Sequence, residues 1–136
     1  MINKYLLDTN ICIFMLKNRY NIRTIINDSI VDNCYISELS IAELYYGAYK
    51  SICPDKGIKE VQLISSRFKT IPVSDSLALF GQLKTDMERS GNKIDDFDLL
   101  IGATAITHDL IMVTDNVKHL GKIPGIQLEN WIESKK

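Results

Sequence analysis

Two aspartates of this 136-residue chain each follow a short apolar run directly. Asp8 comes after Tyr5-Leu6-Leu7, and Asp115 comes after Met112-Val113-Thr114. If both runs are parallel strands, their carboxyl ends bring the two carboxylates to the same edge of a sheet. Each aspartate could also cap the helix that follows it, because Asp is a favoured N-cap residue. The two roles are compatible.

Two further acids are candidates for the same site, and each also has a structural explanation. Glu43 lies in Ser40-x-x-Glu43, a pattern typical of a capping box at a helix start. Asp98 follows Asp95 and Asp96, and acids in a first helical turn are favoured by the helix dipole. The dipole does not explain why Asp98 directly precedes an apolar run that should be buried.

Carboxylates crowded at one edge of a sheet repel one another unless a cation lies among them. The four acids therefore predict a divalent-metal site, and oxygen ligands favour Mg²⁺, with Mn²⁺ as a substitute, over zinc. His108 and His119 lack the spacing of zinc ligands, so we expect them at surface or capping positions.

The elements that would position these acids alternate along the chain. Strand-sized apolar runs occur at Tyr5–Leu7, Cys34–Ile36, Ile71–Val73, Ile111–Val113 and Ile126–Leu128. Helical patterns occur at Asn10–Lys17, Ile22–Ser29, Ser40–Lys50, Ile58–Phe68, Ser76–Ser90 and Phe97–Thr107, with Gly91 placed to stop the fifth. This alternation predicts an α/β domain spanning residues 1–136, with a mostly parallel sheet covered on both faces.

Bulk properties set further limits. An apolar fraction of 46% with 24% charged residues is ordinary for a globular protein, and no apolar run is long enough for a membrane span or a signal peptide. Cys12, Cys34 and Cys53 are odd in number and widely spaced, which predicts reduced core residues and a cytoplasmic location.

The net charge of −1 argues against nucleic-acid binding, which usually goes with a basic excess. Committing four carboxylates to a metal would leave +3 on the rest of the chain, and several basic residues gather in one stretch. They are Lys50, Lys56, Lys59, Arg67 and Lys69.

Other chemistries find little support in the sequence. The nucleophile-elbow, phosphate-loop and dinucleotide-binding glycine motifs are all missing from the chain. A phosphatase that forms an aspartyl-phosphate would want a second acid two residues after Asp8, where Asn10 stands.

Four segments together resemble the motif blocks of PIN-domain VapC toxins, in family order and across nearly the whole chain. They are Leu6–Asn10, Ser40–Gly47, Asp98–Ala105 and Val113–Asn116, and the tail Ile123–Trp131 also resembles the family's C-terminal strand. The resemblance implies a three-layer α/β/α sandwich with a mostly parallel central sheet.

The resemblance also implies an activity, a magnesium-dependent hydrolysis of RNA phosphodiester bonds. Asp8 and Asp98 would hold the metal, Glu43 would bind it or orient the attacking water, and Asp115 would be the fourth acid. The fourth block is the variable one, and His119 stands where some relatives carry another acid.

The same family implies partners: a homodimer, a small antitoxin that masks the acidic cleft, a structured RNA substrate such as tRNA, and contact with DNA only through the antitoxin. Tyr45, Tyr46 and Tyr49 could serve these interfaces, stack on bases, or pack in the core. Two rival functions stay open, a PIN-like module that only binds RNA or protein, and another metal-dependent phosphoesterase such as a phosphatase or a deoxyribonuclease.

Overall fold

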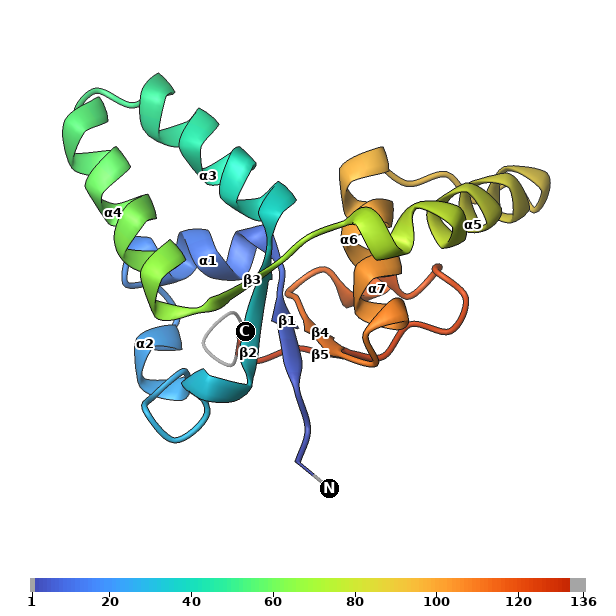
Figure 1. The fold of residues 1–136 in the computed structure, drawn as a ribbon, viewed down its shortest axis with the longest axis horizontal. Helices are drawn as coiled ribbons and strands as arrows, with labels where there is room; N and C mark the ends of the chain where they lie inside the picture. Colours follow the sequence, from blue (N-terminus) through green and yellow to red (C-terminus); the bar gives the residue numbers. More distant parts are fainter. Residues whose placement is uncertain (1, 133–136) are drawn as a thin grey trace.

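A five-stranded, all-parallel sheet forms the centre of the computed structural model, which describes residues 2–132 (Figure 1). The strands are β1 (Tyr5–Leu7), β2 (Cys34–Ser37), β3 (Lys69–Ile71), β4 (Ile111–Val113) and β5 (Leu128–Glu129), in the spatial order β3-β2-β1-β4-β5. Every neighbouring pair is parallel, which confirms the predicted sheet.

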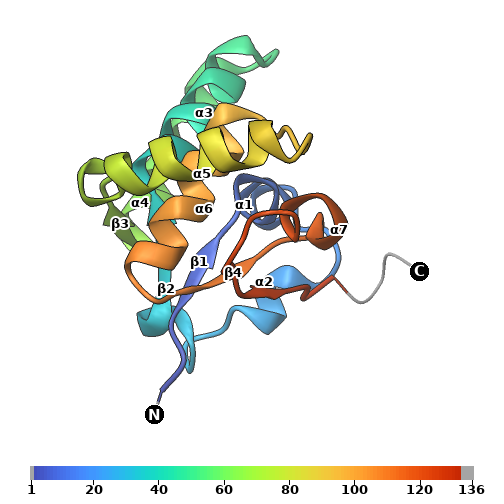
Figure 2. The same cartoon turned by 90° about the vertical axis from the view of Figure 1, so that its right-hand side faces the viewer.

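The helices form a layer on each side of this sheet (Figure 1). They are α1 (Thr9–Leu16), α2 (Ile22–Ile25), α3 (Glu38–Lys50), α4 (Pro54–Arg67), α5 (Leu77–Arg89), α6 (Asp96–Thr107) and α7 (Val117–Leu120). The first four lie on one side and the last three on the other (Figure 1). Figure 2 looks onto the second layer, where α5 crosses α6 in front of the sheet.

The two layers bury alternate side chains of the same strands. Leu7, Ile36 and Val113 pack with the first four helices, whereas Leu6 and Met112 pack with α5, α6 and α7. Successive strand residues point to opposite faces, so short apolar strands serve two cores at once. The predicted three-layer α/β/α sandwich is confirmed.

The strand order places a crevice beside β1. From β1 the chain first builds β2 and then β3 on one side, and it later crosses back to build β4 and β5 on the other. In open parallel sheets, ligands bind outside the carboxyl ends of the strands where this reversal occurs. The carboxyl ends of β1 and β4 are therefore the place to look for chemistry.

The outer strands are shifted from their predicted positions. β3 covers Lys69–Ile71 instead of Ile71–Val73, because Pro72 has no N–H to continue the pairing with β2. β5 pairs through Leu128 and Glu129, slightly later than predicted. Both are edge strands, which pair with a neighbour on one side only. A local apolar run therefore predicts their exact bounds less well than those of a central strand.

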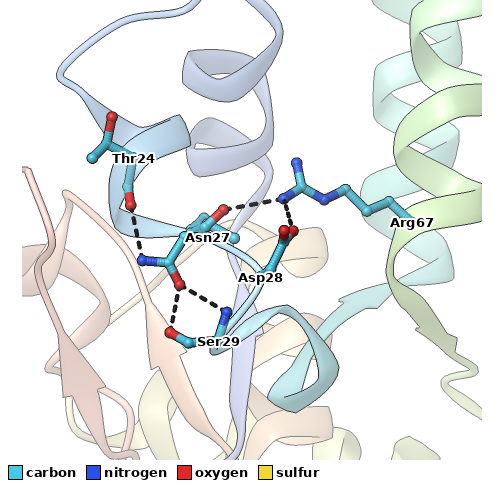
Figure 3. Close-up of polar contacts among 6 residues, drawn as sticks. Thr24, Asn27, Asp28, Ser29 and Arg67 are labelled. Atoms are coloured by element: carbon cyan, nitrogen blue, oxygen red, sulfur yellow. Dashed lines mark hydrogen bonds and ion pairs between the residues drawn. The ribbon is translucent and has the colours of Figure 1, made fainter.

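The α2 helix ends at Ile25, well before the predicted Ser29. The Asn27 side chain accepts a hydrogen bond from the Ser29 N–H at 2.9 Å and donates to the Thr24 carbonyl at 3.3 Å (Figure 3). Such side-chain bonds compete with helix continuation. Arg67 at the end of α4 donates to the Ile26 carbonyl at 3.3 Å and lies 3.9 Å from the Asp28 carboxylate.

Other helix ends follow familiar rules. α4 starts at Pro54, several residues before the predicted Ile58, because proline is well suited to the first helical position. Gly91 stops α5 as predicted, with a φ of 78° that favours glycine.

Cys12 and Cys34 are buried as predicted, whereas the prediction for Cys53 is wrong, because it precedes Pro54 at the exposed start of α4. Within residues 2–132, no helix has the length and apolar character needed to cross a membrane.

Candidate functional site

Asp8 lies at the carboxyl end of the central strand and is 5% exposed. It caps α1, with Oδ1 accepting the Thr9 N–H at 2.8 Å, while Oδ2 accepts the Thr114 hydroxyl at 2.9 Å. Thr114 follows β4, so the second bond joins two neighbouring strand ends. The capping role considered for Asp8 is therefore confirmed, and it fixes the carboxylate in the crevice.

The surroundings of Asp8 disfavour its charged form. Burial, together with the charges of Asp98 and Asp115, raises the pKa of this carboxyl from an ordinary 3.8 to about 6. The hydrogen bonds from Thr114 and Thr9 oppose the shift without cancelling it. A carboxylate desolvated among other carboxylates is an unfavourable arrangement that a bound cation would relieve.

The raised pKa of Asp8 leads to a prediction about stability. Folding favours the protonated carboxyl, so the stability that protonation contributes is full below about pH 4 and is lost as pH rises through 6. We expect the metal-free protein to lose roughly 1 kcal/mol of this contribution between pH 5 and pH 7. Urea unfolding at the two pH values should show it, and an equal loss in Asp8→Asn would exclude Asp8 as its source.

The start of α3 differs from its prediction. Ser37, not Ser40, is the N-cap residue, and its hydroxyl accepts the Leu39 N–H at 3.1 Å. Glu43 consequently lies in the second turn, and the capping-box interpretation is wrong. The α3 helix starts earlier because β2 runs directly into it through Ser37.

A network of side-chain bonds holds Glu43 instead. The Thr9 hydroxyl donates to Glu43 Oε1 at 2.7 Å and lies 2.8 Å from the Ser40 hydroxyl, which is fully buried. Because Thr9 has one hydroxyl proton and an ionised Glu43 can only accept, Ser40 must donate to Thr9. This directional chain ties the start of α1 to α3 and sets the position of the Glu43 carboxylate.

Asp98 lies in the first turn of α6, after the N-cap residue Asp95, whose Oδ2 accepts the Phe97 N–H at 3.1 Å. Burial, Asp95 and Glu43 raise the pKa of the half-buried Asp98 carboxyl, and His119 lowers it. The helix dipole favours all three acids of this turn. Asp98 also interacts electrostatically with both Asp8 and Glu43.

Three of the four predicted acids line one cleft of about 770 Å³: Asp8 directly after β1, Glu43 in α3 and Asp98 in α6. Asn116 lines the cleft where Asp115 was predicted. Asp115 is half-buried beside it and acts on Asp8 through its charge. The remaining lining residues are Thr9, Asn10, Ile13, Ala42, Tyr46, Gly47, Asp95, Phe97 and Leu120.

One of the two histidines takes a position expected of it, whereas His119 lies closer to the acids than predicted, since it lowers the pKa of Asp98. His108 is the C-cap residue of α6, with its N–H donating to the Thr104 carbonyl. His119 is half-buried within α7 and caps neither of its ends. The sequence analysis missed Thr9, Ser40 and Thr114 as residues that position the acids. Two of them could have been suspected, because Thr9 is adjacent to Asp8 and Thr114 is adjacent to Asp115.

The donor set fits a hard divalent cation. Within residues 2–132, no three carboxylate, imidazole or thiol groups are gathered tightly enough to form a complete ligand cage. Mg²⁺ does not require one, because it usually binds one or two carboxylates and completes its shell with water and substrate phosphate. Asp8 and Asp98 offer those carboxylates in one cleft, and both have raised pKa values.

Comparison with known proteins places the chain among relatives that cover almost all of it. The PIN domain family matches residues 5–124. The tRNA(fMet)-specific endonuclease VapC of Salmonella typhimurium is 35% identical over 130 residues, covering 94% of this chain and 98% of the relative. Ribonuclease VapC2 of Rickettsia felis is 34% identical over 134 residues, covering 93% and 97%.

Solved structures agree with the sequence relatives. DNA-bound VapBC from Salmonella typhimurium superposes with a TM-score of 0.88 at 32% identity, covering 96% of this chain and 99% of the other. VapBC2 from Rickettsia felis, bound to a DNA fragment from its promoter, gives a TM-score of 0.85 at 32% identity, covering 93% and 98%.

Proposed function

The chain belongs to the PIN-domain family and is an endoribonuclease toxin of the VapC type, and on that premise we propose that it uses magnesium at Asp8, Glu43 and Asp98 to hydrolyse a structured RNA. The observation that carries the proposal is the convergence of these three carboxylates, from separate elements, in one cleft at the carboxyl ends of the strands. We also propose that residues 1–136 act as a single domain in the cytoplasm.

The carboxylates have different tasks in this proposal. Asp8 and Asp98 hold the metal, and Glu43 binds it or orients the attacking water. The Thr9 bond uses one acceptor site of Glu43 Oε1 and leaves the carboxylate able to accept a proton from that water. When bound, Mg²⁺, or Mn²⁺ in its place, supplies polarisation of the phosphate and a lower pKa for coordinated water. Asp115 adds negative charge behind Asp8.

RNA is the proposed substrate because the relatives are named as ribonucleases, and tRNA is the proposed class because the Salmonella relative is specific for tRNA(fMet). The test uses purified protein with tRNA, single-stranded DNA and a small phosphate ester, each with magnesium or with excess chelator. We expect only tRNA with magnesium to be cut. Undiminished cleavage in chelator would contradict the metal mechanism, and ester hydrolysis alone would favour a phosphatase.

An antitoxin is the proposed protein partner, because several structural neighbours are VapBC complexes. An Arg or Lys side chain from this partner could occupy the cation's place between the carboxylates and so silence the cleft. We further propose a homodimer that meets DNA only through the antitoxin. Two of the solved complexes are bound to DNA.

The toxin assignment predicts a growth phenotype. Expression of the protein alone should arrest bacterial growth, because cleaved tRNA stops translation, and co-expression of the neighbouring short reading frame should relieve the arrest. Colony counts after induction measure both effects. Harmless expression at high yield of folded wild-type protein would count against the assignment and would favour a PIN-like module that only binds.

A further inference from the structure

Gly47 occupies a position in α3 that the fold does not explain. Glycine inside a helix lowers its stability relative to alanine. A Cβ placed on Gly47 would meet nothing within 4 Å, so close packing does not require the glycine. Its φ is not in the left-handed region, which rules out a conformational reason as well. The missing side chain leaves open space instead.

That open space lies directly beside the candidate active site. Gly47 lines the acidic cleft together with Glu43, one helical turn earlier. It also lines a neighbouring cavity of about 480 Å³ between α1, α3 and α4. A molecule that reaches the Glu43 carboxylate along this face of α3 therefore passes close to the helix backbone at Gly47.

Two exposed aromatic rings line the same cleft. Tyr46 in α3 is 67% exposed and Phe97 in α6 is 42% exposed, although both are large enough to favour burial. Lys50 Nζ lies 5.5 Å from the centre of the Tyr46 ring. Flat rings with a cation beside them, next to carboxylates that would bind a metal ion, suit the bases and phosphate backbone of a nucleic acid.

We propose that Tyr46, Gly47 and Phe97 form a binding site for unpaired RNA nucleotides beside the bond to be cut. The two rings stack on bases, and the missing side chain at Gly47 lets the ribose-phosphate backbone approach α3. The RNA must be unpaired there, because the base faces of a duplex are already covered by their neighbours. The proposal rests on the ribonuclease function above and specifies how its substrate is held.

The cleft favours RNA over a protein segment as the occupant of this site. Both rings lie in the cavity that contains Asp8, Glu43 and Asp98, where the proposed reaction holds the RNA, and not in the second cavity between α1, α3 and α4. An antitoxin side chain that enters between these carboxylates would meet the same rings, so antitoxin binding is measured separately below.

The chain offers a matched control for Gly47. Gly81 is also an exposed glycine inside a long helix, a Cβ there would meet nothing within 4 Å, and it lines none of the cavities described. Both Gly47→Ala and Gly81→Ala should raise the melting temperature by a few degrees, because alanine favours helix. Only Gly47→Ala should impair cleavage.

The experiment measures kcat and KM with magnesium on a stem-loop RNA and on the same strand annealed to its complement. For the stem-loop we expect Gly47→Ala and Tyr46→Leu each to lower kcat/KM about tenfold or more, mainly through KM, with Gly81→Ala unchanged. The wild type should cut within the loop and cut the duplex poorly.

Three results would overturn the proposal. The first is that Gly47→Ala and Tyr46→Leu both match Gly81→Ala in kcat/KM, and the second is that the wild type cuts the duplex as fast as the loop. The third is that Gly47→Ala leaves cleavage intact but weakens antitoxin binding in a calorimetric titration, which would assign the site to the protein partner. A wild type that cuts no RNA at all would be a different failure, that of the ribonuclease function itself.

Discussion

Asp98→Asn is expected to abolish RNA cleavage, with a loss of about three orders of magnitude or more, while the metal-free protein stays as stable as the wild type or becomes more so near neutral pH. The activity loss corresponds to about 4 kcal/mol of transition-state stabilisation and follows from losing a proposed metal ligand. The stability should not fall, because burial and the charges of Asp95 and Glu43 already disfavour the ionised Asp98 carboxyl.

Asp96→Asn is the matched control for this change. Asp96 lies in the same first turn of α6 but pairs with Lys84 at 3.0 Å on the surface, outside the acidic cleft. Its loss should change the melting temperature little, because an exposed ion pair contributes little to stability, and leave the cleavage rate near that of the wild type. Single-turnover cleavage and chelator-treated thermal unfolding on the same preparations measure both quantities. Substantial residual activity in folded Asp98→Asn would remove this residue from the site.

Glu43→Gln separates a structural from a catalytic role for the third carboxylate. Gln keeps an oxygen that can accept the Thr9 hydroxyl, so the tie between α1 and α3 should survive with at most a few tenths of a kcal/mol lost. It removes the negative charge that a metal or an attacking water requires. We therefore expect the rate to fall by about two orders of magnitude, equivalent to about 2.7 kcal/mol.

Glu38→Gln is a suitable comparison because it makes the same chemical change at the first residue of α3. The Glu38 carboxylate accepts the Val73 N–H at 3.0 Å and has no place in the cleft lining. Its melting temperature and single-turnover rate should both stay close to those of the wild type. If Glu43→Gln behaved in the same way, Glu43 would be only a structural link between helices.

Local patterns were enough to predict the strands and most helices. Adjacent strand residues such as Leu6 and Leu7 are both apolar, because they point to opposite faces of the sheet and each face carries a core. The result is a short apolar run that can be recognised in the sequence. The position of Asp8 could be predicted for the same reason, since a carboxylate that ends a central strand must lie at the edge of the sheet. Helix ends were less predictable, because several residues in a row could serve as the cap, as Ser37 and Ser40 show.

The sequence by itself thus determined a parallel sheet between helical layers, the family, and which acids could work together. Only the tertiary structure decided how those acids are held. The Thr9–Glu43 bond spans 34 residues and the Thr114–Asp8 bond spans 106, and Asn116 rather than Asp115 lines the cleft. Periodicity and capping record what a residue does with its near neighbours in the chain. Contacts between distant segments depend instead on how whole helices and strands pack, and no short stretch of sequence records that packing.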